Sequence, residues 1–191
     1  MQTLLIALML VQVSPTDAAD YGRYNRLTQY DSHFSKYSKR YFGVGFDWRY
    51  FKAQAIAESN LRPDARSSLG ARGVMQIMPA TFDEIRERHG GIADAIEEPR
   101  WNIAAGIWYN RQNFSMWRAD RTFLERLKFM FGSYNAGRGN ILRAQREALR
   151  NGMNGTLWSS IERHLPNVTG RHSTETLTYV SRILNIKGSL R

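Results

Sequence analysis

The sequence predicts an all-α protein, because apolar residues recur at helical spacing, helix caps recur along the chain, and no segment alternates like a strand. One stripe at i, i+4, i+7 and i+11 consists of Tyr30, Phe34, Tyr37 and Tyr41. A second stripe with the same spacing consists of Phe123, Leu127, Met130 and Tyr134. Such a stripe lies along one face of a helix, so we expect both to pack into a core.

Capping residues predict where the helices begin and end. Four side chains suited to a helix start are those of Asp47, Thr81, Asn102 and Thr122. Thr81 and Thr122 are each followed three residues later by Glu, which is the capping-box pattern. Gly137 is expected to end one helix, and Pro166 to end a short helix over 157–165.

Composition narrows the classes of function. The chain has 191 residues, enough for one ordinary domain, and it has no cysteine. Its four histidines are far apart in sequence, so we expect no metal site and no cofactor. The net charge of +10 and the pI near 10.2 favour an acidic polymer as partner, either nucleic acid, an anionic membrane surface or an anionic glycan. No apolar run reaches 18 residues, so no transmembrane segment is expected.

The first 18 residues differ from the rest of the chain. An uncharged apolar stretch is followed by Pro15 and then by small residues up to Ala18, which predicts a secretory signal over residues 1–18. The n-region carries no Lys or Arg, and a buried N-terminal helix is the alternative interpretation. Residues 19–29 form a basic lead-in. The signal predicts a periplasmic or secreted protein.

Glu58 is the first candidate for acid–base chemistry. It shares a helical face with Phe51 and Ala55 and lies at the C-terminal end of its helix. An apolar environment and the negative end of the helix dipole both raise the pKa of a carboxyl group, which a general acid requires. A solvated Glu at a frayed helix end is the competing interpretation.

Four short motifs follow one another in the chain. They are Glu58 with Ser59, the run GVMQIMPAT over 73–81, the run SYNAG over 133–137, and the late pairs Glu175-Thr176 and Tyr179-Val180. In this order they resemble the motifs of the SLT-type lytic transglycosylases, over roughly residues 30–186. Ser133 replaces the Ala that this family has at the start of its third motif.

The resemblance implies a lysozyme-like fold, a single catalytic domain over 30–191 with a helical bundle around a glycan cleft. It also implies cleavage of the MurNAc–GlcNAc β-1,4 bond of peptidoglycan with formation of 1,6-anhydro-MurNAc. Glu58 would be the acid and then the base. The substrate-side residues that the resemblance implies are Ser59, Met75, Gln76, Tyr134, Asn135, Glu175 and Tyr179.

The resemblance assigns each of these residues a role. Ser59 and Gln76 would hydrogen-bond the substrate, and Met75 would line the sugar site. Tyr134 would direct the proton of Glu58, with Asn135 supporting the same wall. Glu175 would contact substrate, and Tyr179 would close the site.

Three alternatives remain open at this point. The same fold could serve a hydrolytic muramidase that uses water and a second carboxylate. The chain could also be a non-catalytic glycan-binding component of a secretion, conjugation or phage assembly. Specific nucleic-acid binding is not expected, because the basic start lacks a recognised motif. The expected partner is the peptidoglycan glycan strand.

Overall fold

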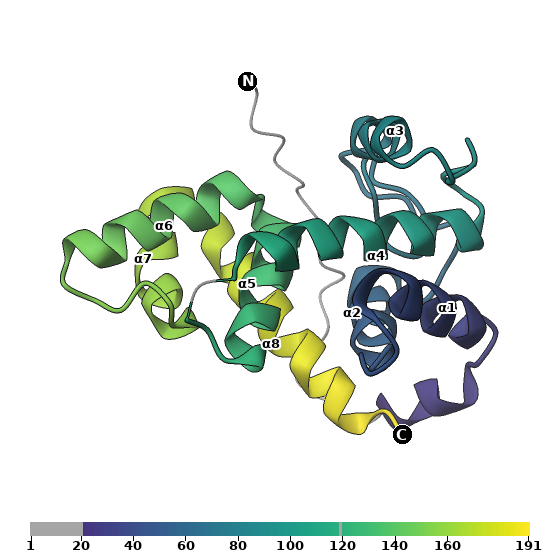
Figure 1. Cartoon of the computed structure of the whole chain (residues 1–191), viewed down its shortest axis with the longest axis horizontal. Coiled ribbons are helices and arrows are strands. Elements are labelled where there is room, and N and C mark those ends of the chain that lie inside the picture. The colour runs from purple at the N-terminus through teal and green to yellow at the C-terminus, as the bar shows by residue number, and fades with distance from the viewer. Residues whose placement is uncertain (1–20, 119) are drawn as a thin grey trace. The chain divides into compact units, whose positions relative to one another are not determined.

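The computed structural model describes residues 21–118 and 120–191, so the predicted signal over 1–18 lies outside the described residues. Within these ranges the chain forms helices joined by loops, of which the one over 60–78 is long (Figure 1). In chain order they are η2 (Tyr21–Arg26), α1 (Asp31–Phe42), α2 (Arg49–Ser59), α3 (Pro79–Arg88), α4 (Pro99–Met116), α5 (Phe123–Ala136), α6 (Arg138–Arg150), α7 (Trp158–Thr169) and α8 (His172–Ser189). The described part contains two isolated bridges but no strand, which confirms the all-α prediction.

The chain divides into two compact units. Among the described residues, one unit comprises 21–109 and 182–191, and the other comprises 110–118 and 120–181. Helices α4 and α8 each contribute residues to both units.

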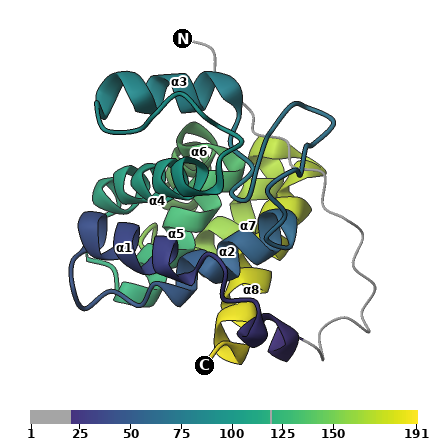
Figure 2. The same ribbon diagram turned by 90° about the vertical axis from the view of Figure 1, so that its right-hand side faces the viewer.

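In the unit of residues 21–109, α1 packs against α2. Three aromatic rings fill the junction: the Phe46 ring lies 4.4 Å from that of Phe42 and 5.2 Å from that of Phe51. A buried ion pair joins the same helices, with Lys52 Nζ 2.8 Å from Asp31 Oδ1. In both views the first half of α4 lies between α3 on one side and the α1–α2 pair on the other (Figures 1 and 2).

In the unit of residues 110–181, α6 packs along α7 and also contacts α5. Gly132 of α5 lets the Trp158 ring approach closely, because a Cβ at this position would lie 2.2 Å from the ring. The stripe predicted from Phe123 to Tyr134 becomes α5, and three of its four members are buried, Phe123 being exposed.

Helix boundaries confirm the predictions for Thr122 and for Gly137, which directly follows the last residue of α5, and correct others. Thr122 caps α5 by accepting the N–H of Glu125. The predictions for Thr81 and Asn102 were wrong, because α3 and α4 already begin at Pro79 and Pro99, and proline is favourable in a first turn. Pro166 does not end a helix either: it lies in the last turn of α7, where its missing N–H removes a single helical hydrogen bond.

Candidate active site

Helix α2 places Glu58 at its penultimate position. Every residue of α2 from Phe51 to Ser59 is buried, and Glu58 is 9% exposed with its Oε2 atom buried. Asp47 stabilises the start of α2, since its Oδ1 accepts the backbone N–H of Arg49 at 3.0 Å. Partial burial alone would raise the pKa of Asp47, but hydrogen bonds from Arg49 and Lys187 lower it below its usual value. The carboxyl group of Glu58 is therefore held at the end of a helix that is buried from Phe51 to Ser59, and Trp48 rather than the predicted Asp47 occupies its N-cap position.

The chain turns sharply directly after Glu58 and Ser59. Asn60 and Leu61 have φ angles of 54° and 64°, in the left-handed region, which is uncommon for side chains other than Asn and Gly. Tyr24 of η2 donates its hydroxyl hydrogen to Asn60 Oδ1 at 2.8 Å. This contact supports the strained turn next to the candidate acid.

The second motif forms a tight loop over residues 73–77. Arg72 and Ile77 exchange two backbone hydrogen bonds of 3.0 Å, which close the loop. Gly73 has a φ of 77° and Gln76 a φ of 46°, so both lie in the left-handed region. Glycine reaches this region without steric cost, whereas Gln76 is held there by the closed loop.

Two predicted substrate-binding side chains hold this loop in place. Ser59 Oγ donates to the Val74 carbonyl at 2.8 Å and so ties the end of α2 to the loop. Gln76 Nε2 donates to the carbonyls of Ala65 and Gly73, at 3.0 and 2.9 Å. The side chains of Ser59 and Gln76 are both buried, and their roles toward substrate stay predictions.

Asn102 is a positioning residue that the sequence analysis missed. Its Oδ1 accepts the backbone N–H of Met75 at 2.7 Å, and its Nδ2 donates to the carbonyls of Arg72 and Ile96 at 3.0 and 2.8 Å. The side chain is 0% exposed and lies where a Cβ on Gly73 would clash, at 2.6 Å. The sequence signal that could have indicated this role is the position of Asn102, a polar residue, in the apolar run that continues with Ile103.

Met75 points into the protein. It is 0% exposed and packs on Gly106 of α4, where a Cβ would lie 2.9 Å from the Met75 side chain. Its predicted place in the sugar site stays a prediction, and the structure assigns it a packing role in the loop.

The other four predicted residues belong to the unit of residues 110–181. Tyr134 and Asn135 lie in the last turn of α5 and are buried. Thr176 Oγ1 donates to Asn135 Oδ1 at 2.7 Å, which brings Asn135 to the α8 turn that carries Glu175. Tyr179, one turn further along α8, is fully buried. Within this unit the third and fourth motifs therefore meet at Asn135 and Thr176.

Two further properties concern metals and membranes. In residues 21–118 and 120–191, no three His, Asp or Glu side chains gather closely enough to hold a metal ion. None of the helices described is both long and apolar enough to cross a membrane.

The order of the motifs and their local geometry agree with a comparison against known families. The Transglycosylase SLT domain model matches residues 32–154, more than half of the chain. The chain belongs to the SLT transglycosylase family. Its motifs were therefore assigned to the correct family from the sequence.

Two curated relatives of this SLT chain carry the same name. It is 31% identical to membrane-bound lytic murein transglycosylase F of Desulfosudis oleivorans, over 84% of this chain and 36% of that protein. It is 30% identical to the protein of the same name from Haemophilus influenzae, over 81% of this chain and 30% of that protein. The SLT chain thus spans about a third of the length of these relatives.

Solved structures support the lysozyme-like fold. The 70 kDa soluble lytic transglycosylase of Escherichia coli aligns with a TM-score of 0.65 and 22% identity, over 94% of this chain and 31% of that one. An inactive mutant of lytic transglycosylase Slt from Pseudomonas aeruginosa aligns with a TM-score of 0.66 and 22% identity, over 84% of this chain and 23% of that one. At this identity the likeness shows the fold.

Proposed function

We propose that the chain is a lytic transglycosylase that cleaves the MurNAc–GlcNAc β-1,4 bond of peptidoglycan and leaves a 1,6-anhydro-MurNAc end. The observation that carries the proposal is the place of Glu58, buried at the end of α2 beside the loop that Ser59 anchors. The family membership and the relatives named as lytic murein transglycosylases support the same activity.

In the first half of the reaction Glu58 acts as the general acid. Its carboxyl proton passes to the glycosidic oxygen, the bond from that oxygen to the anomeric carbon breaks, and the GlcNAc-side fragment leaves as an alcohol. The substrate's acetamido group or an ion-pair state stabilises the positive anomeric centre. Burial favours the protonated carboxyl group that this step needs.

In the second half the ionised Glu58 acts as the base. It takes the proton from the sugar's 6-hydroxyl, whose oxygen attacks the anomeric carbon and closes the anhydro ring. No water is consumed, and Glu58 is protonated again. The nucleophile is tethered to the reacting carbon, so a large part of the entropic cost of bringing it there is already met.

The proposed substrate, peptidoglycan, also indicates where the protein would act. Peptidoglycan lies outside the cytoplasm, which agrees with the secretory signal predicted over 1–18. The net charge of +10 favours association with the carboxylates of that polymer. We propose peptidoglycan strands as the partner and a periplasmic or cell-wall location.

Mass analysis of digested peptidoglycan tests the proposal. Purified sacculi are incubated with the protein, and the released fragments are weighed before and after borohydride treatment. We expect fragments lighter by one water than the hydrolytic products and unchanged by borohydride. Reducible fragments would instead identify a hydrolytic muramidase, and an absence of fragments would point to a glycan-binding protein.

A further inference from the structure

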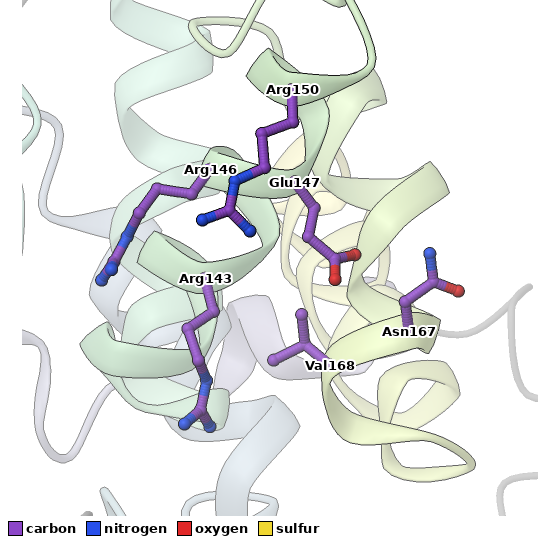
Figure 3. A pocket seen from close by; sticks show the side chains of 6 residues that line it. All are labelled: Arg143, Arg146, Glu147, Arg150, Asn167 and Val168. Carbon is purple, nitrogen blue, oxygen red and sulfur yellow. The ribbon is translucent and has the colours of Figure 1, made fainter.

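A pocket of about 430 Å³ lies between α6 and α7, and none of its lining residues is assigned to the candidate site. We call it the arginine pocket; its lining residues are Arg143, Arg146, Glu147, Arg150, Asn167 and Val168 (Figure 3). Its volume is within the range of small-ligand sites. The three arginines are at i, i+3 and i+7 of α6, so the helix presents them on one face.

The charges of the arginine pocket are not balanced within the described part of the chain. None of its three guanidinium groups forms an ion pair there, although Arg143 donates a hydrogen bond to Asn140 Oδ1. Arg146 and Arg150 are exposed at its edge. Three positive groups and the single carboxylate of Glu147 leave the pocket strongly basic.

Glu147 limits what the pocket can hold. Its Oε2 atom is buried without a hydrogen-bond donor among the described residues, which costs free energy until a donor arrives. The last torsion of a Glu side chain is soft, so a small rotation can turn either oxygen toward a ligand. Figure 3 shows this carboxylate on the Asn167 side, with the guanidinium groups on the other side.

The guanidinium groups and the Glu147 carboxylate of the arginine pocket together indicate one ligand chemistry. Guanidinium groups bind carboxylates through paired hydrogen bonds, and the Glu147 carboxylate needs an ammonium or amide N–H. A phosphate polymer would offer Glu147 only repulsion. A short acidic peptide supplies both the carboxylates and the N–H donors.

Hydrogen bonds connect the arginine pocket to the third motif. Arg143 donates to Asn140, whose Nδ2 donates at 2.7 Å to the carbonyl of Ala136. Ala136 directly follows Tyr134 and Asn135 at the end of α5. The pocket is therefore linked within one unit to the residues predicted to face the glycan.

We propose that the arginine pocket binds the acidic peptide substituents of the peptidoglycan strand, through Arg146 and Arg150 to carboxylates and through Glu147 to an N–H donor. The proposal rests on the proposed function for the source of the peptide. It assigns the surface between α6 and α7 a role in recognising substituted strands.

Binding is tested without catalysis by NMR titration of the isotope-labelled protein with the acidic peptide Ala-Glu-Ala-Glu, which has three carboxylates and one ammonium group. We expect shifts in the amides of the arginine pocket, and about tenfold weaker binding for the double variant Arg146→Gln, Arg150→Gln. The matched control, Arg26→Gln with Lys39→Gln, removes two exposed charges elsewhere and should change the affinity less than about twofold. Equal weakening in both variants, or tighter binding of inorganic phosphate at the same amides, would overturn the proposal.

Glu147→Gln tests the donor requirement. This variant should weaken binding of the peptide several-fold, because an amide oxygen accepts an N–H hydrogen bond less strongly than a carboxylate does. An unchanged affinity would show that Glu147 accepts no N–H of the peptide and would overturn its assigned role.

Activity on two strand types separates this proposal from the proposed function. The arginine double variant should cleave peptide-free glycan like the unaltered protein and peptide-bearing strands several-fold more slowly. A variant that cleaves peptide-bearing strands as fast as the unaltered protein does would refute a role of the pocket in strand recognition. If the unaltered protein cleaves neither strand type, the proposed function fails. The peptide titration still shows whether the arginine pocket binds the peptide.

Discussion

The 73–77 loop and the arginine pocket use polar side chains in opposite ways. Around the loop, Ser59, Gln76 and Asn102 are buried and direct their donors to backbone carbonyls of the protein. In the arginine pocket, Arg146 and Arg150 are exposed and form no ion pair with the described residues. Polar groups near the candidate acid therefore build a scaffold, whereas those of the pocket remain available to a ligand.

This difference predicts which substitutions lower the stability of the fold and which change ligand binding. Removing a buried partner leaves backbone groups without hydrogen bonds, which destabilises the fold. Removing an exposed charge changes binding and leaves the fold nearly as stable as before. The predictions below probe the two regions from the largest expected effect to the smallest.

Glu58→Gln should lower turnover by roughly 10² to 10⁴, because the amide cannot donate the proton that a general acid supplies. The fold should persist, since Gln is nearly isosteric with Glu. Turnover of peptidoglycan is measured beside circular dichroism. The matched control is Glu162→Gln on the exposed face of α7, which should keep full activity. A folded Glu58 variant retaining more than about a tenth of the turnover would refute the assignment.

Asn102→Ala should lower the free energy of unfolding by roughly 2 to 4 kcal/mol, because one buried backbone N–H and two partly buried carbonyls lose their partner. Urea unfolding measures the change. Asn185→Ala, at an exposed position of α8, should stay within about 0.5 kcal/mol of the parent. Equal stability of the two variants would show that the loop does not depend on Asn102.

Gly106→Ala should destabilise the protein by about 1 to 3 kcal/mol, because the added methyl group presses on Met75 beneath the loop. Gly188→Ala meets nothing within 4 Å and should be neutral or stabilising. Thermal unfolding of both variants checks the pair. A stabilised Gly106 variant would mean that the packing of Met75 is loose.

The double variant Arg146→Gln, Arg150→Gln should change the free energy of unfolding by less than about 0.5 kcal/mol, since both side chains are exposed. The same urea titration that reports on Asn102 serves here. A loss comparable to that of Asn102→Ala would mean that the pocket is part of the scaffold, and the contrast between the two regions would disappear.

The fold class could be predicted because it depends on local spacing. The same spacing placed Glu58 on an apolar helix face, but it left a solvated Glu at a frayed helix end open, and the fold decides for burial. Helical periodicity and one residue's position on a helix face are visible within a few turns of sequence. Local patterns gave the wrong helix start at Thr81 and Asn102, because a proline two or three residues earlier already begins the helix. The helix end predicted at Pro166 was also wrong, because the last turn of α7 accommodates this proline.

The contacts that position the site were beyond prediction for a different reason. Asn102 bonds to Met75, which is 27 residues away, and Thr176 bonds to Asn135 across 41 residues. No local pattern encodes which distant backbone group a buried amide will meet. The arginines of α6 show their common face in the sequence, but only the fold places Asn167 beside them.

The most direct test of the account is the fate of water during cleavage. Peptidoglycan is digested in water that carries heavy oxygen, and the new sugar ends are analysed by mass spectrometry. Because the 6-hydroxyl of the sugar attacks the anomeric carbon, we expect no heavy oxygen in the product ends. Heavy oxygen at the new ends would contradict the account, since it would show that water attacks and that a second carboxylate activates it.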